Sequence, residues 1–318
     1  MERPILGIHH VTAIATDPQR NLDFHAGLLG LRLVKRTVNF DDPGTYHFYF
    51  GDERGTPGTL LTFFPWPLAA RGSRGVGQAT ATSFSVPADS LGYWHDRLRE
   101  AGVVMEDPAE RFAEELLTFL DPDGLELELV AEAAAEEVVP WESGPVPAEH
   151  SIRRIHSVTL SVDGYQATAD LLTSGMGFEL AGEAGNRFRF AAGSGGGGCT
   201  VDVLCVPGAP FGRVAAGSVH HVAWRVADDL AQRRWRERLV ERGLDVTPIL
   251  DRQYFHSIYF REPGGVLFEI ATDPPGFAID EPVAELGQHL RLPGWLEPRR
   301  ERIEEVLPPI HLPDRAPR

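Results

Sequence analysis

Val219-His220-His221-Val222 begins the segment that decides the fold, and this segment closes with Glu262-Pro263-Gly264-Gly265-Val266-Leu267-Phe268-Glu269-Ile270. The opening is typical of a strand that carries two imidazoles, and the close is typical of a turn followed by a strand that contains a carboxylate. Two imidazole nitrogens and one carboxylate oxygen suit a divalent transition metal that keeps positions open for chemistry. A second copy of the opening, Ile8-His9-His10-Val11-Thr12, stands near the other end of the chain.

The repetition extends to four modules, each with a strand, a helix, a glycine and then further strands. In the first module a strand over 8–16 precedes a helix that Asp17 caps and Gly30 ends. In the fourth, Asp228 or Asp229 caps a helix that ends at Gly243, and strands continue to Ile270. Further strands are predicted over 31–40, 45–50, 59–64, 79–86, 116–120, 125–130, 154–160, 188–191 and 199–206, and helices over about 90–100 and from Asp163 to Gly175 or Gly177.

Four β-α-β-β-β units predict an α+β fold in which paired units curl into two open β-barrels. By sequence, residues 1–140 hold the first two units, residues 151–273 hold the last two, and 131–150 is the candidate linker. The glycine run over 193–198 lacks the Lys-Ser/Thr of a phosphate loop, so a hairpin loop is expected there. The tail, 274–318, should contain a short helix near 295–306, and it either covers a pocket or packs on the outside.

Composition limits the classes of partner. The chain has 318 residues, 42% of them apolar, and a formal net charge of −16, which argues against nucleic acid and anionic membranes as partners. Cys199 and Cys205 fit neither a disulfide framework nor a C-x-x-C metal spacing. The sequence has no recognisable signal peptide and no apolar stretch long enough to span a bilayer, so a cytoplasmic enzyme is expected. The sequence does not decide whether the protein forms a homo-oligomer.

Aligning the four modules selects the candidate metal ligands. The second His of each pair, His10 and His221, is found only in modules one and four, since module three has Ser157 at that position. At the closing strands, Glu269 falls opposite Glu128 of module two and Asp202 of module three. Only modules one and four together supply His10, His221 and Glu269. The metal should therefore lie in a barrel that these two modules form, and the barrel of modules two and three should bind none.

A simpler interpretation exists for each of these residues. Neighbouring residues on a strand point to opposite faces, so one ring of each His pair could be a wall residue and the other exposed to solvent. Glu269, however, lies among apolar neighbours, where burial without a cation or base would be costly. A 2-His-1-carboxylate set with open positions is typical of non-haem Fe(II) oxygenases. Fe(II) is therefore the expected cofactor, with Mn(II) as the alternative.

The modules with His, His and Glu resemble the vicinal oxygen chelate superfamily. More narrowly, the chain resembles hydroquinone-type ring-cleaving dioxygenases in 9–12, 33–40, 46–50, 55–59, 251–252 and 259–265. The resemblance implies that Fe(II) is held by the first and last modules, and that the substrates are a dihydroxybenzene and O2. It also implies roles beside the metal for five residues of the expected types, His9, Thr12, His220, Arg252 and Tyr259.

Within this set, Tyr259, His9, His220 and Arg252 are the candidate catalytic residues, and Thr12 is expected to bind substrate. Tyr254 and His256 are added as candidate substrate contacts because they are close in sequence to the site segment. The other histidines, His47 among them, have no matching partner in the repeats and are interpreted as structural or exposed. Three alternatives stay open: a catechol extradiol dioxygenase, a glyoxalase-type isomerase or lyase, and a metal-free binding module.

Overall fold

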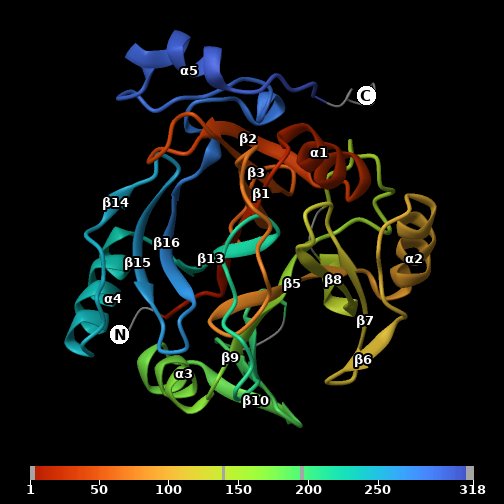
Figure 1. The fold of residues 1–318 in the computed structure, drawn as a ribbon, viewed down its shortest axis with the longest axis vertical. Coiled ribbons are helices and arrows are strands. Elements are labelled where there is room, and N and C mark those ends of the chain that lie inside the picture. The colour runs from red at the N-terminus through yellow and green to blue at the C-terminus, as the bar shows by residue number, and fades with distance from the viewer. Residues whose placement is uncertain (1–3, 138–139, 194–196, 313–318) are drawn as a thin grey trace.

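Two eight-stranded, curled sheets form most of the protein, of which the computed structural model describes residues 4–137, 140–193 and 197–312 (Figure 1). The first sheet has the order β14-β15-β16-β13-β1-β4-β3-β2 and the second the order β10-β11-β12-β9-β5-β8-β7-β6. The strands of the first sheet are β1 (Ile8–Ala15), β2 (Arg32–Val38), β3 (Tyr46–Gly51), β4 (Leu60–Pro65), β13 (Ser218–Val226), β14 (Leu250–Asp251), β15 (Phe255–Arg261) and β16 (Leu267–Pro275). Those of the second are β5 (Gln78–Val86), β6 (Ala109–Arg111), β7 (Glu114–Leu120), β8 (Glu126–Ala131), β9 (Arg154–Val162), β10 (Glu179–Ala184), β11 (Arg187–Ala191) and β12 (Thr200–Cys205).

Each sheet joins two modules through one antiparallel strand pair. In the first sheet β1 of module one pairs with β13 of module four, and in the second β5 of module two pairs with β9 of module three. The structure confirms the predicted α+β fold, in which four modules pair into two open barrels and module one pairs with module four. Each sheet combines one module from 1–140 with one module from 151–273. The two halves of the chain therefore do not form separate sheets, and their division into domains at these bounds stays a prediction.

The central strand pair of each sheet is irregular at the histidine positions. In the β1/β13 pair the register shifts between Ile8 and His10 on β1. It shifts again between His221 and Val219 on β13, which pair with Thr12 and Ala13. The residues left out of the register are His9 and His220. Such β-bulges re-aim side chains, so the two rings of a pair need not point to opposite faces as the alternation of a regular strand predicts.

The helices cover the outer sides of the sheets (Figure 1). They are α1 (Pro18–Leu22), α2 (Leu91–Glu100), α3 (Gln166–Asp170), α4 (Asp229–Glu241) and α5 (Arg300–Val306), with π-helical turns over Asp23–Leu28 and Leu171–Gly175. The Asp17 carboxylate accepts from Arg20 N at 2.8 Å, as predicted, and Asp228 rather than Asp229 caps α4 by accepting from Ala231 N at 2.8 Å. Short 3-10 helices lie at Ala88–Ser90, Ala133–Glu137, Phe277–Ile279, Val283–Glu285 and Glu297–Arg299.

Apolar side chains from the helices and from the sheets form the core. Trp94 and Leu98 of α2 are buried, as are Trp235 and Leu239 of α4. The burial of each such side chain stabilises the fold by roughly 1.5–3 kcal/mol. The helical spacing of these residues places them on one face, which is why the sequence predicts both helices.

The tail after β16 packs against β2 and β3, above them in Figure 1. Lys35, which is fully buried, places its Nζ 2.6 Å from both Asp280 Oδ1 and Glu281 Oε2. Arg36 of β2 forms a bridge with Leu290, and the Tyr46 hydroxyl donates to Pro308 O at 3.0 Å. The tail thus lies along the edge of the first sheet, and the helix predicted near 295–306 is α5 preceded by a 3-10 turn.

Two other expectations fall partly on residues 138–139 and 194–196, which lie outside the described residues. The candidate linker has the 3-10 turn Ala133–Glu137 at its start. The described end of the glycine run reaches both sheets, since Gly198 N donates to His156 O at 2.8 Å and Gly198 O accepts from Ile8 N at 2.7 Å. Cys199 and Cys205 are free thiols. Among the described residues, no helix has the length and apolar character needed to cross a membrane.

Candidate metal centre

Three ligand atoms from three strands meet inside the first sheet. His10 Nε2 of β1 and His221 Nε2 of β13 lie 3.2 Å apart. Glu269 Oε2 of β16 lies 2.9 Å from His221 Nε2 and 3.4 Å from His10 Nε2. Within the described part of the chain, these side chains form the one group of three or more His, Cys, Asp or Glu residues whose ligand atoms converge in this way, and all three are buried.

The donor set fits a divalent metal. A metal binds such ligands at about 2.1 Å, so two ligands at right angles around it lie about 3.0 Å apart, close to the three observed separations. Glu269 Oε2 is buried and, apart from the two imidazoles, has no polar partner among the described residues. A buried carboxylate oxygen without a partner is costly unless a cation is present. His10, His221 and Glu269 would therefore hold one metal on one side, with its other positions open to the interior.

Each candidate ligand imidazole is held by the histidine before it. His9 Nδ1 lies 2.9 Å from His10 Nδ1, and His220 Nδ1 lies 2.8 Å from His221 Nδ1. An imidazole that presents its Nε2 lone pair carries its proton on Nδ1, so His10 and His221 donate to acceptor nitrogens of His9 and His220. Burial lowers the pKa of His9 well below its usual value and that of His220 to about 3, which keeps both acceptors neutral. The bulges at His9 and His220 make these contacts within each pair possible.

Ser257 orients the carboxylate of Glu269. Its hydroxyl is fully buried on β15 and donates to Glu269 Oε1. This bond occupies one carboxylate oxygen and leaves Oε2 facing the two imidazoles. Hydrogen bonds to ligands from such outer groups fix the direction of the ligand. Ser257 was not among the residues selected from the sequence, because a serine beside a histidine carries no recognisable signal.

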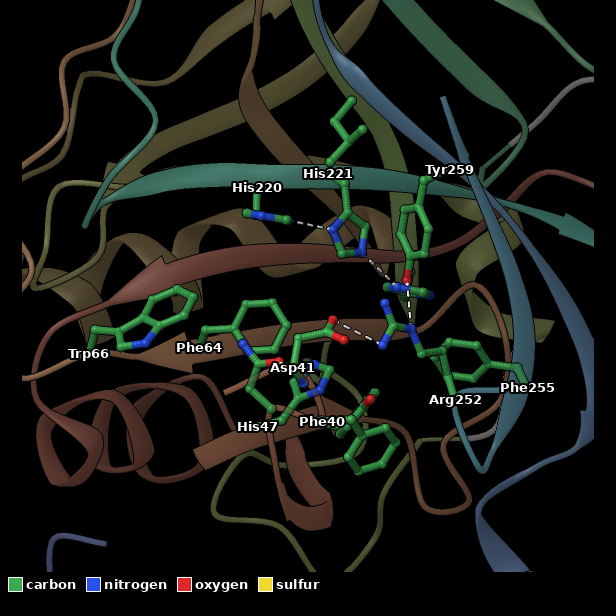
Figure 2. Close-up of a pocket in the computed structure, with 14 residues that line it drawn as sticks. Phe40, Asp41, His47, Phe64, Trp66, His220, His221, Arg252, Phe255 and Tyr259 are labelled. Carbon is green, nitrogen blue, oxygen red and sulfur yellow. Dashed lines mark hydrogen bonds and ion pairs between the residues drawn. The ribbon is translucent and has the colours of Figure 1, made fainter. Parts of the chain in front are cut away.

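A cavity of about 300 Å³ opens from the metal centre (Figure 2). Its walls are mostly aromatic, with a few polar groups. The lining residues are His10, Asn39, Phe40, Asp41, His47, Tyr49, Phe64, Trp66, His220, His221, Arg252, Phe255, Tyr259 and Leu267. A mostly apolar cavity with a few converging polar groups is the usual form of a small-molecule site. Its volume and aromatic walls suit a single aromatic ring.

Arg252 and Tyr259 form a polar pair on the cavity wall. Arg252 Nε donates to the Tyr259 hydroxyl at 3.3 Å, and Arg252 Nη1 lies 3.0 Å from the exposed carboxylate of Asp41. Burial, and then the charge of Glu269, raise the pKa of Tyr259 above its usual value. Tyr259 therefore keeps its proton and can donate it.

All three residues selected as substrate contacts lie outside the cavity lining, as do His9 and Glu269, which stand behind the two imidazoles that line it. Thr12 is buried behind the wall, where its hydroxyl lies 2.8 Å from that of Thr62. The Tyr254 hydroxyl donates to Asp280 Oδ2 at 3.0 Å, in the cluster that holds the tail. His256 Nδ1 lies 2.6 Å from Asp229 Oδ1 at the start of α4. Their predicted contact with substrate has no direct geometric support.

Comparison with known proteins connects this geometry to a family. The family model of the glyoxalase/bleomycin resistance protein/dioxygenase superfamily matches residues 7–129 and 154–270. These two ranges contain the four modules and all three candidate ligands.

The chain belongs to this superfamily.

Several relatives of the superfamily cover nearly the whole chain. MhqO of Bacillus subtilis (strain 168), provisionally assigned as a ring-cleaving dioxygenase, is 47% identical over 312 residues, which are 98% of this chain and 99% of that protein. The chlorohydroquinone/hydroquinone 1,2-dioxygenase of Sphingobium indicum is 35% identical over 305 residues, covering 93% and 94%. The crystal structure of a provisionally assigned dioxygenase from Bacillus subtilis matches with a TM-score of 0.93 at 46% identity, covering 98% of this chain and 99% of that one. Glyoxalase I of Zea mays, with a TM-score of 0.63 and 14% identity over 89% and 97%, shares the fold.

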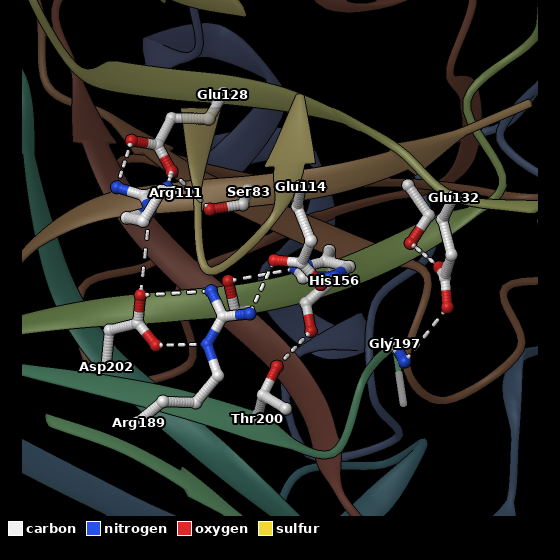
Figure 3. A network of polar contacts seen from close by, with 12 residues as sticks. Ser83, Arg111, Glu114, Glu128, Glu132, His156, Arg189, Gly197, Thr200 and Asp202 are labelled. Carbon is white, nitrogen blue, oxygen red and sulfur yellow. Dashed lines mark hydrogen bonds and ion pairs between the residues drawn. The ribbon is translucent and has the colours of Figure 1, made fainter. Parts of the chain in front are cut away.

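In this member of the superfamily the second sheet also has carboxylates at the position of Glu269, but arginine side chains bind them (Figure 3). Glu128 pairs with Ser83 as Glu269 pairs with Ala223, so the two glutamates occupy matching positions. Arg111 binds Glu128 through both Nη atoms, with Nη1 at 3.0 Å from Oε1 and Nη2 at 2.5 Å from Oε2. Arg189 Nε donates to Asp202 Oδ1 at 2.7 Å. Guanidinium groups thus neutralise these carboxylates, a physical reason to expect no metal there.

The sequence analysis missed two polar residues of the cavity wall, His47 and Tyr49. His47 was interpreted as structural or exposed, but it lines the cavity. Both lie on β3, two residues apart, and so share one face of the strand. Because module one supplies no ligand from β3, aligning the ligand positions could not select His47 or Tyr49. The signal that could have selected them is their spacing of two residues on a strand, which places both side chains on one face.

Proposed function

We propose that this protein is a ring-cleaving dioxygenase that opens a 1,4-dihydroxybenzene, hydroquinone or a substituted form, with O2. The expected metal is Fe(II), with Mn(II) as the alternative, held by His10, His221 and Glu269. The observation that carries the proposal is the convergence of two Nε2 atoms and an otherwise unpartnered carboxylate oxygen at the end of an aromatic cavity. The name of the Sphingobium indicum relative supports the same class of substrate.

The protein's own groups would position the ring and control its protons. A bound Fe(II) supplies open coordination positions and the electron transfer between ring and O2. Phe64 and Phe255 hold the ring from the cavity walls and keep water away. Arg252 is placed to bind a phenolate or a developing oxyanion by charge-assisted hydrogen bonds. Tyr259, which keeps its proton, can transfer it to an oxygen of the opening ring.

Oxygen uptake tests this proposal. The protein is purified without air, loaded with Fe(II), and supplied with hydroquinone or catechol in an oxygen electrode. We expect consumption of O2 with hydroquinone and a ring-opened product that contains both oxygen atoms, as mass spectrometry with ¹⁸O2 would reveal. Faster cleavage of catechol would assign the protein to extradiol dioxygenases. Metal binding without O2 uptake with either diol would contradict the proposal and favour an isomerase or lyase.

A further inference from the structure

His47 and Tyr49 lie side by side on the wall of the cavity that opens from the candidate metal centre. Their ring centroids are 4.0 Å apart, and both come from one face of β3. Figure 2 shows His47 below His221, and both line the same cavity. A ring bound at the metal by one oxygen would occupy the cavity that both residues line.

The Tyr49 hydroxyl is available to a ligand. Tyr49 is 1% exposed, and its hydroxyl makes no hydrogen bond with the described residues. Burial raises the pKa of Tyr49 well above its usual value, so the hydroxyl keeps its proton. Because Tyr49 lines the cavity, a ligand atom there can bond to its hydroxyl, which typically contributes roughly 0.5–1.5 kcal/mol.

His47 is already oriented by the hydroxyls behind it. Its Nε2 lies 3.0 Å from Thr62 Oγ1, which lies 2.8 Å from Thr12 Oγ1. Burial, followed by the charges of the nearby histidines, lowers the pKa of His47 well below its usual value, so the ring is neutral. Since Nε2 is used in this chain, Nδ1 is the nitrogen left for the cavity, and either tautomer can bond to a hydroxyl. This connection gives Thr12 an indirect role in the site.

The second sheet explains why this wall suits an uncharged group. Tyr49 pairs with Thr62 in the first sheet as Arg189 pairs with Asp202 in the second, so Tyr49 matches Arg189. By the same count His47 matches Arg187, whose Nη1 lies 3.3 Å from Asp202 Oδ2. In the second sheet these positions are charged and bonded to one another. In the first they are neutral, which leaves open a wall that can bond to a hydroxyl without a countercharge.

We propose that His47 and Tyr49 bind the ring hydroxyl remote from the metal, and so select a para-diphenol over a monophenol or a catechol. This inference rests on the proposed function. In a catechol both oxygens can reach the metal, whereas the second oxygen of a hydroquinone lies across the ring and must find partners on the protein. Without a partner in an aromatic cavity, that hydroxyl would disfavour binding.

Binding of hydroquinone and phenol, measured without O2, tests the inference. The protein is loaded with Zn²⁺, which has no redox chemistry, and both ligands are titrated by calorimetry. We expect Tyr49→Phe and His47→Phe to weaken hydroquinone binding about tenfold, the size of one hydrogen bond, and to leave phenol binding unchanged. Tyr46→Phe is the matched control, since Tyr46 lies on the same strand but bonds to the tail, and it should leave both affinities unchanged.

The inference is overturned if either variant weakens phenol and hydroquinone equally, or if neither variant changes the preference for hydroquinone. The Zn²⁺ titration reports binding and needs no turnover. A protein that prefers hydroquinone through these residues but consumes no O2 with Fe(II) would therefore support this inference while contradicting the proposed reaction.

Discussion

His10 Nε2 and His221 Nε2 lie 3.2 Å apart, although 211 positions separate the two residues in the chain. The contact follows from the antiparallel pairing of β1 with β13, which brings the first and last modules into one sheet. A separation of this size is what two ligands of one metal require. The arrangement therefore leads to predictions about metal binding that the two matching sheets can test against each other.

His10→Ala should remove the metal, and Ser157→Ala should not. Ser157 occupies the position in the second sheet that His10 occupies in the first, so the pair of variants controls for general damage to a central strand. We expect His10→Ala to weaken metal binding by more than about 100-fold. This exceeds the loss in metal affinity that follows when a residue that only hydrogen-bonds to a ligand is removed. Metal content after dialysis measures this. Equal metal content in the two variants would contradict the assigned ligands.

Ser257→Ala should weaken metal binding without removing a ligand. Loss of the hydroxyl frees Glu269 Oε1 to rotate, and such changes typically cost about 10–100-fold in metal affinity. Ser83→Ala removes a hydroxyl that donates to Glu128 Oε2 at 2.5 Å in the second sheet, and it should leave metal affinity unchanged. Competition with a chelator gives both constants. Rescue by Ser257→Thr would separate orientation from packing, and an unchanged affinity in Ser257→Ala would reject this role.

Tyr259→Phe should slow turnover while metal content stays constant. If Tyr259 supplies a proton to the opening ring, its loss should lower kcat by about 10²–10⁴-fold. The phenyl ring retains the packing against His221, whose ring centroid lies 5.6 Å away. Steady-state oxygen uptake and metal analysis on the same sample measure both quantities. A rise in KM with kcat unchanged would instead assign Tyr259 to substrate binding alone.

Asp121, in the turn before β8, should make the protein less stable at alkaline pH. Burial raises the pKa of Asp121 from 3.8 to about 7, so the folded state disfavours its charged form. Its contribution to stability is complete below about pH 4 and is lost as the pH rises through 7. Asp121→Asn keeps the Oδ1 acceptor used by Leu125 N at 2.7 Å. Between pH 6 and pH 8.5 the unmodified protein should lose about 1 kcal/mol more than this variant, measured by urea unfolding. Parallel pH profiles would contradict the shift.

The sequence was sufficient for the repeat, its pairing and the candidate ligands, because each depends on residue types at repeated positions. His10, His221 and Glu269 could be selected since the other modules lack one member of the set. Asp228 could not be distinguished from Asp229 as the cap of α4, because both residues can accept the same hydrogen bond and only backbone geometry decides between them.

The cavity wall was harder to predict, because it depends on curvature and bulges that residue types do not encode. Tyr254 and His256 are close in sequence to Arg252, yet the structure turns their side chains to the tail and to α4. His47 and Tyr49 are far from every ligand in sequence and reach the cavity through the pairing of β3 with β4. Ser257 is recognisable only once its hydroxyl is seen on Glu269.

The pairing of the first module with the last also has a consequence during synthesis. β1 leaves the ribosome well before its partner β13 and the glutamate of β16. The middle modules can complete their own sheet before β13 is available to pair with β1. A nascent or truncated chain that ends before β16 thus lacks one of the three converging side chains, so the metal centre can form only after β16 has been translated.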